Sequence, residues 1–141
     1  MIDVDQSSPP LDGRAPSVSV VIPCLDEVRT IGTCVRKALA GLAQAGVLGE
    51  VIVVDNGSSD GSAEAARAAG AIVISESTRG YGAAYLAGLR AARGAYFVMG
   101  DGDDTYDFLE IPRFLAGLVD GKADLVIGDR LTGDIRPGAM S

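Results

Sequence analysis

The stretch Tyr96-Phe-Val-Met-Gly-Asp-Gly-Asp-Asp-Thr105 joins a short apolar run to three carboxylates within four positions. The run Tyr96–Met99 has the length of a buried strand. The carboxylates of Asp101, Asp103 and Asp104 would repel one another at the end of such a strand unless a cation lies among them. Oxygen ligands at this spacing suit Mg²⁺ or Mn²⁺, which also bind substrate phosphates. The stretch therefore predicts a strand that ends in a metal–nucleotide site. The alternative is an acidic turn that is merely solvated.

Strand and helix patterns alternate on both sides of this stretch. Apolar, β-branched runs predict five strands, at Ser17–Pro23, Glu50–Val54, Ala71–Ile74, Ala95–Met99 and Ala123–Ile127. Helical spacing predicts four helices, at Val28–Ala45, from an N-cap at Ser59 or Asp60 to Ala69, at Ala83–Ala92, and at Leu109–Leu118 with Pro112 in its first turn. Such alternation requires right-handed crossovers. The sequence therefore predicts an α/β fold, a three-layer α/β/α sandwich around a mainly parallel sheet.

Length and charge limit the organisation of the chain and its partners. The 141 residues suffice for one domain, and we expect residues 1–16 to be a flexible tail and residues 17–130 to form the domain. A net charge of −7 argues against a nucleic-acid partner. No apolar run reaches the roughly 18–20 residues that cross a bilayer, and no signal peptide opens the chain, so we expect a soluble, cytoplasmic protein.

Histidine and cysteine contribute little to the predicted chemistry. The chain has no histidine, so acid–base work would fall to carboxylates or to the substrate itself. Its two cysteines, Cys24 and Cys34, form no metal-binding pattern. We expect both to be small buried thiols.

Charged residues follow the predicted strands, at the edge where ligands bind in parallel sheets. These strand exits carry Asp26, Glu27, Asp55, the Asp101–Asp104 cluster, Asp129 and Arg130. So acidic an edge would repel the phosphates of a nucleotide unless a divalent ion intervenes. Arg79 and Arg130 could share the remaining phosphate charge.

Three of these features have two interpretations on local sequence. Asp55 suits a carboxylate that accepts hydrogen bonds from a base N–H or a ribose hydroxyl, or one that forms an Asx-turn. The turn at Gly80-Tyr-Gly82 could contact phosphate, or could serve packing and turn geometry. Glu27 could act at the site, or could be a first-turn helix residue favoured by the helix dipole.

Four further patterns follow one another along the chain, at Val20–Glu27, Val53–Gly61, Arg79–Gly88 and Met99–Asp103. In this collinear order they resemble family 2 glycosyltransferases of the GT-A fold. The nearest branch resembles the dolichol-phosphate mannosyltransferase-like enzymes, which charge a polyprenyl phosphate with a sugar. The resemblance runs from about Ser17 to Arg130 and implies a Rossmann-like nucleotide-binding half.

The resemblance implies roles for individual residues. The nucleoside would be surrounded by Pro23, Leu25, Glu27, Val53 and Asp55. Asp101, Gly102 and Asp103 would form the DXD-type motif, with Asp103 as the main metal ligand and catalytic carboxylate and Asp101 beside ribose and metal. Arg130 would contact the diphosphate, with Arg79 and Gly80 as weaker phosphate contacts.

The sequence departs from the family pattern at two positions. The tyrosine common two residues after the first-strand proline is Leu25 here, which argues against aromatic stacking of the base or ribose at that point. The metal-binding glutamine expected two residues after Asp103 is Thr105 here. Either Thr105 or Asp104 could substitute for it.

The resemblance also implies a reaction. An inverting transfer would move a sugar from a GDP- or UDP-sugar to an acceptor, with Mg²⁺ or Mn²⁺ neutralising the leaving diphosphate. A polyprenyl phosphate acceptor would need no base, because its second pKa near 6 leaves it largely ionised at neutral pH. Residues 131–141 would begin an acceptor loop of a longer protein. That protein could work at the cytoplasmic face of a membrane.

Two other functions fit parts of the sequence. A haloacid-dehalogenase-type phosphatase would use Asp101 as nucleophile and Asp103 as general acid, with Val126–Asp129 and Asp134 as its late acidic motif. Only about 25 residues separate these two motifs, and Lys122 is the only lysine between them. A non-catalytic nucleotide-binding module would share the same fold. Neither the nucleotide nor the oligomeric state follows from the sequence.

Overall fold

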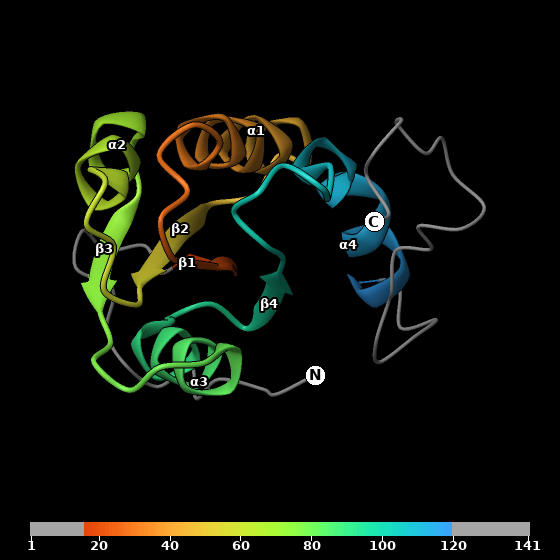
Figure 1. Ribbon diagram of the computed structural model, residues 1–141. Helices are drawn as coiled ribbons and strands as arrows, with labels where there is room; N and C mark the ends of the chain where they lie inside the picture. The colour runs from red at the N-terminus through yellow and green to blue at the C-terminus, as the bar shows by residue number, and fades with distance from the viewer. Residues whose placement is uncertain (1–15, 120–141) are drawn as a thin grey trace.

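The computed structural model describes residues 16–119, which contain a four-stranded parallel sheet (Figure 1). Its strands are β1 (Val18–Cys24), β2 (Gly49–Asp55), β3 (Ile72–Ser75) and β4 (Tyr96–Met99), in the order β3-β2-β1-β4. Every pairing is parallel, as predicted. Four predicted features lie outside the described residues. They are the strand Ala123–Ile127, Arg130, residues 131–141 and all but the last residue of the N-terminal tail.

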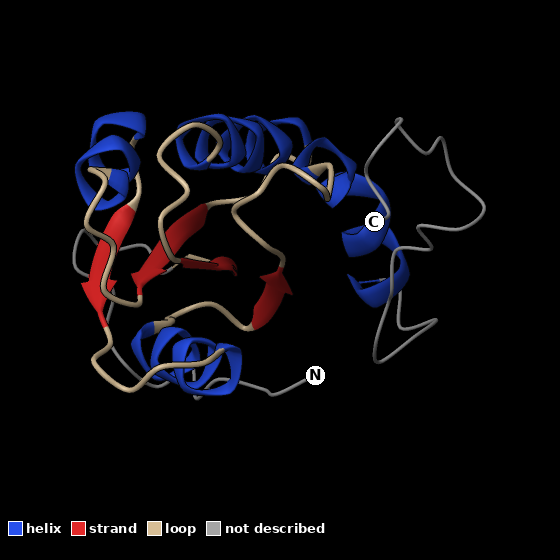
Figure 2. Cartoon of the chain, in the orientation of Figure 1, coloured by secondary structure: helices blue, strands red, loops and turns tan. Residues whose placement is uncertain are grey.

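Helices cover both faces of the sheet. They are α1 (Ile31–Gln44), α2 (Ser62–Ala69), α3 (Tyr81–Ala91), the 3₁₀ helix η1 (Phe108–Glu110) and α4 (Ile111–Val119). Helices α1 and α2 lie on one face and α3 on the other (Figures 1 and 2). This arrangement confirms the predicted three-layer sandwich. Within residues 16–119, no helix is both long enough and apolar enough to cross a membrane.

Three helices begin later than the sequence predicts. Helix α4 begins at Ile111 rather than Leu109, because the 3₁₀ helix η1 precedes it. Helix α1 begins at Ile31 rather than Val28, because residues 25–30 form a loop in which Asp26 adopts a φ of 51°. Helix α2 begins at Ser62, and its N-cap is Gly61 at φ 93°, so the predicted N-cap at Ser59 or Asp60 is wrong. In contrast, Pro112 lies in the first turn of α4, as predicted, because its missing N–H costs little there.

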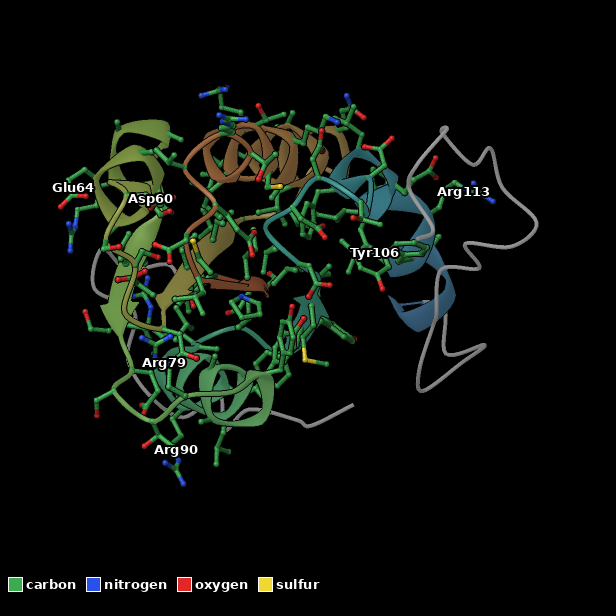
Figure 3. The ribbon with its side chains drawn as sticks, viewed as in Figure 1. Asp60, Glu64, Arg79, Arg90, Tyr106 and Arg113 are labelled. Atoms are coloured by element: carbon green, nitrogen blue, oxygen red, sulfur yellow. The ribbon has the colours of Figure 1, made fainter. Side chains whose placement is uncertain are left out.

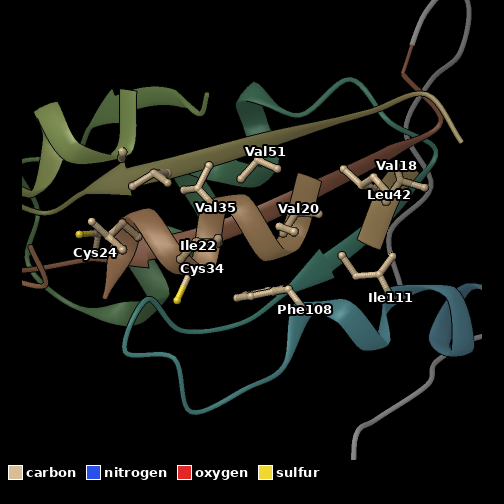
Figure 4. Close-up of a cluster of buried hydrophobic side chains, with 14 of the residues drawn as sticks. Val18, Val20, Ile22, Cys24, Cys34, Val35, Leu42, Val51, Phe108 and Ile111 are labelled. Atoms are coloured by element: carbon tan, nitrogen blue, oxygen red, sulfur yellow. The ribbon is translucent and has the colours of Figure 1, made fainter. Parts of the chain in front are cut away.

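The core is divided by the sheet into two apolar layers. Since successive strand residues point to opposite faces, Val20 and Ile22 pack beneath α1 (Figure 4). Val21 points to the other face and packs with residues of α3. Gly88 lets α3 lie close to the sheet, since a Cβ at this position would overlap the side chain of Val21.

Both cysteines lie buried as free thiols, as predicted. Burial raises the pKa of Cys24 and of Cys34 to about 11, so both thiols are neutral near pH 7. Neither is therefore activated as a nucleophile.

A buried polar cluster closes the amino end of the sheet. Glu50 of β2, only 7% exposed, accepts hydrogen bonds from Ser19 Oγ at 2.7 Å and from the Arg93 N–H at 2.8 Å. Arg93 also forms an ion pair with it at 3.2 Å. The Gly94 N–H donates to Ser19 Oγ. The cluster joins β1, β2 and the segment before β4, and leaves the opposite edge for the site.

Candidate functional site

The loops after β1, β2 and β4 meet at the carboxyl edge of the sheet, where the sequence predicts the site. The Asn56 N–H donates to the Cys24 carbonyl oxygen at 2.9 Å, and Thr30 Oγ1 donates to the Gly102 carbonyl oxygen at 2.6 Å. These contacts bring the β2 and β4 exits to opposite sides of the β1 exit. The sheet order explains this, because β1 lies between β2 and β4.

Within the DXD turn, the carboxylates have different partners. The Thr105 N–H donates to Asp103 Oδ1 at 2.9 Å, which curves the chain back over the motif. Asp104, at φ 61°, forms an ion pair with Lys37 of α1 at 2.9 Å. Asp104 is therefore engaged in holding the turn on α1. Asp104 and Thr105 are the two candidates to replace the family glutamine. The ion pair with Lys37 uses Asp104 and leaves Thr105 as the other candidate.

Glu27 lies against this turn. A Cβ built on Gly102 would stand 2.6 Å from Glu27 Oε2, so a larger residue there would displace the Glu27 carboxylate. Oε2 is buried and has no hydrogen-bond partner among the described residues. Burial, together with the charges of Asp103 and Asp101, raises the pKa of Glu27 to about 7. The side chain of Glu27 therefore lies close to two further carboxylates, those of Asp101 and Asp103.

These residues fit a divalent cation held jointly with a ligand. The described residues contain no group of three or more acidic, cysteine or histidine side chains already arranged as a complete metal site. Mg²⁺ commonly uses one or two carboxylates and takes its other ligands from water and substrate phosphates. Asp101 and Asp103 can supply the carboxylates. Glu27 Oε2, buried and without a hydrogen-bond partner among residues 16–119, fits a cation bound nearby.

Reciprocal hydrogen bonds between the β1 and β2 exits fix the backbone of Glu27. Ser62 Oγ accepts from the Glu27 N–H at 2.8 Å, and Asp60 Oδ2 accepts from the Val28 N–H at 3.1 Å. In return, Asp26 Oδ1 accepts from the Ser59 N–H at 2.8 Å. The hydrogen bond from Ser62 lowers the pKa of Asp60. The sequence analysis missed these roles, although Asp26 in the first turn and the Asp and Ser residues of the second were the available signal.

Asp55, at the end of β2, forms the Asx-turn that one of its two predicted interpretations requires. Its Oδ1 accepts a hydrogen bond from the Ser58 N–H at 3.2 Å, which is the Asx-turn contact. Among the described residues, Oδ2 accepts no hydrogen bond. The side chain is thus held by one oxygen while the other can accept from a ligand.

Tyr85 of α3 is a site residue that the sequence analysis missed. Its hydroxyl donates to Asp101 Oδ1 at 3.4 Å. Burial and the charge of Asp101 raise its pKa, so the phenol keeps its proton. Tyr81 and Tyr106 lie near the same carboxylate, and Figure 3 shows Tyr106 on the segment before α4. The recurrence of tyrosine in the Gly80–Tyr85 segment and after the DXD turn was the only signal.

The remaining predicted site residues are placed as follows. Pro23 is buried in β1, and Leu25 is 38% exposed in the loop after it. Val53 is fully buried in the core, so no part of this residue is open to a ligand in this structure. Arg79 lies over Gly57, beside the turn that follows β2 (Figure 3), and Gly80 is the N-cap of α3. Arg130 lies outside the described residues.

Named relatives of the chain are glycosyltransferases. It is 45% identical over 126 residues to the low-salt glycan biosynthesis hexosyltransferase Agl6 of Haloferax volcanii, covering 89% of this chain and 30% of that protein. It is also 45% identical over 83 residues to the dolichyl-phosphate hexose transferase of the same organism, covering 59% of this chain and 36% of that protein. The chain therefore spans about a third of the length of each relative.

Solved structures of similar proteins share the fold of this chain. Glucosyl-3-phosphoglycerate synthase from Mycobacterium tuberculosis, in complex with Mn²⁺, UDP-glucose and phosphoglyceric acid, superimposes with a TM-score of 0.64 at 29% identity. The match covers 76% of this chain and 40% of that one. Mannosyl-3-phosphoglycerate synthase from Rubrobacter xylanophilus gives 0.65 at 27% identity, covering 74% and 36%. These neighbours confirm the GT-A fold.

The family assignment rests on a match over most of the chain. The model for glycosyl transferase family 2 matches residues 19–140. The phosphatase alternative gains no support from these comparisons, and its late acidic motif, Val126–Asp129 with Asp134, lies outside the described residues. The chain belongs to glycosyl transferase family 2.

Proposed function

We propose that this chain is the donor-binding part of an inverting hexosyltransferase that uses a nucleotide diphosphate sugar, a divalent cation and a lipid phosphate acceptor. The buried Glu27 oxygen that has no hydrogen-bond partner among residues 16–119, close to the carboxylates of Asp101 and Asp103 at one sheet edge, carries the proposal. Such a charge arrangement favours a cation that brings a polyphosphate with it. A named relative that is a dolichyl-phosphate hexose transferase supports the lipid acceptor.

The two parts of the donor would bind at different strand exits, the nucleoside near Asp55 and the diphosphate near Asp101 and Asp103. Asp55 would accept a hydrogen bond from the base or ribose, and the backbone near Pro23, Leu25 and Val53 would surround the nucleoside. Asp101 and Asp103 would hold Mg²⁺ or Mn²⁺. When bound, the ion supplies positive charge that stabilises the leaving diphosphate.

The acceptor decides whether the chain needs a general base. A phosphate monoester is already largely ionised at neutral pH, so a lipid phosphate could attack without losing a proton to the protein. A hydroxyl acceptor needs a base, and this chain has no histidine to act as one. The phosphoglyceric acid in a structural neighbour is a soluble acid. It is the second acceptor class to test.

Thermal unfolding with candidate ligands tests the proposal. We expect UDP or GDP to raise the melting temperature only when Mn²⁺ is present, because the cation would hold the diphosphate at the acidic edge. A ligand at a hundred times its Kd stabilises the native state by about 2.7 kcal/mol, which such a measurement detects. An equal shift with and without Mn²⁺ would contradict the metal's role. A shift by neither nucleotide would contradict donor binding. For the acceptor, the longer protein should transfer hexose to a polyprenyl phosphate and not to phosphoglyceric acid; the reverse preference would refute the lipid assignment.

A further inference from the structure

Asn56, the residue after Asp55, makes three hydrogen bonds through a buried amide. Its Nδ2 donates to the carbonyl oxygens of Glu76 at 2.7 Å and Thr78 at 2.8 Å. Its Oδ1 accepts from the Gly80 N–H at 2.9 Å. The residue is 6% exposed, and only one orientation of the amide satisfies all three partners. This side chain therefore ties the segment after β3 to the exit of β2.

The segment that Asn56 holds carries Arg79. Asn56 binds the backbone on both sides of it, at Thr78 and Gly80. A Cβ built on Gly57 would stand 3.5 Å from Arg79 Nη2, so the guanidinium lies next to the space that a side chain at this position would fill. Figure 3 shows Arg79 beside the turn that follows β2. Asn56 thus fixes the backbone from which the guanidinium reaches that turn.

This position is on the Asp55 side of the site. Strand β1 separates β2 from β4, so Arg79 approaches a different strand exit from the one that carries Asp101 and Asp103. A guanidinium is planar and stacks on the faces of aromatic bases. A carboxylate such as Asp55 can accept from the edge of the same base. The two side chains could therefore recognise one nucleobase from its face and its edge.

We propose that Asn56 is a positioning residue for nucleoside recognition: it fixes residues 76–80 so that the Arg79 guanidinium lies beside Asp55 and packs on the base of the bound nucleotide. This assigns Arg79 to the nucleoside rather than to the phosphates. The inference rests on the proposed function, because it requires a nucleotide as ligand.

A double-mutant cycle tests the coupling of the two residues. Calorimetry with Mn²⁺ would measure UDP and GDP binding to the parent, Asn56→Ala, Arg79→Ala and the double variant. For the nucleotide that the parent binds more tightly, we expect each single variant to bind about fivefold to tenfold more weakly. The double variant should bind the nucleotide no more weakly than whichever single variant binds it more weakly, because Asn56 acts through Arg79. Inorganic pyrophosphate with Mn²⁺ should bind all four proteins equally.

Three outcomes would overturn the inference. They are parental nucleotide affinity in Asn56→Ala, a double variant whose loss equals the product of the single losses, and weaker pyrophosphate binding in Arg79→Ala. Ser77→Ala, in the same segment, is the matched control and should bind as the parent does. If Asn56→Ala does not fold, Asn56→Ser gives the same test, since its neutral, shorter side chain cannot reach Glu76, Thr78 and Gly80 together. A parent that binds pyrophosphate but neither nucleotide would contradict the proposed function as well.

Discussion

Glu27 shows most clearly what a single residue contributes to this site. The sequence predicts a carboxylate at the β1 exit, and the resemblance places it near the nucleoside. The structure turns Oε2 toward Gly102 and the DXD motif. Residue type alone could not show this, because the contact joins residues 75 positions apart in the sequence.

The raised pKa of Glu27 predicts a pH-dependent stability. Between the ordinary value of 4.5 and about 7, folded Glu27 keeps a proton that the unfolded chain has released. Its contribution to stability therefore falls as pH rises through this window and is constant above it. In metal-free buffer we expect Glu27→Gln to be roughly 1–2 kcal/mol more stable than the parent at pH 8, allowing for solvent screening, and equal to it at pH 4. Urea unfolding at both values measures this; the same difference at pH 4 and pH 8 would count against it.

Tyr85 predicts an effect on ligand binding without a large effect on stability. Tyr85→Phe removes the donor to Asp101 Oδ1 but keeps the ring that packs in α3. We expect Mn²⁺-dependent nucleotide affinity to fall by about twofold to fivefold, as for one long hydrogen bond to a charged group. Tyr96→Phe, at the other end of β4, is the control. Equal affinities in the parent and Tyr85→Phe would show that the hydroxyl does not position Asp101.

At the level of elements, the sequence predicts which segments are strands and helices better than where they begin. The late starts of α1 and α2 arise from hydrogen bonds between the β1 and β2 exits, which hold residues such as Asp26 and Asp60 outside the helices. A single-segment pattern carries no information about a partner loop. Pro112 was placed correctly because its constraint is local.

Glu50 joins β1, β2 and the segment before β4, so its removal should lower the free energy of unfolding. Glu50→Ala leaves Arg93 and the backbone N–H without their buried acceptor. We expect a loss of about 2–4 kcal/mol in the free energy of unfolding. Glu110→Ala removes a carboxylate from an exposed ion pair with Arg113 and should change stability by less than about 0.5 kcal/mol. Comparable losses in the two variants by denaturant unfolding would contradict the buried cluster's role.

For the whole molecule, the alternation of strands and helices was enough to predict the layers and the parallel sheet. It did not give the order β3-β2-β1-β4, because crossovers can place a strand on either side of its predecessor. That order puts Glu27 beside the β4 exit and Asp55 with Arg79 on the other side of β1. The site is thus a consequence of topology as much as of motif.

Calorimetric titration with Mn²⁺ and a nucleoside diphosphate tests the central claim most directly. The claim is that Asp103 holds a cation that binds the donor's diphosphate, while Asp55 binds its nucleoside. We predict that Asp103→Ala loses Mn²⁺-dependent binding of UDP or GDP, and that Asp55→Ala binds the nucleotide more weakly but keeps its affinity for Mn²⁺ with pyrophosphate. Parental affinity in Asp103→Ala would contradict the claim.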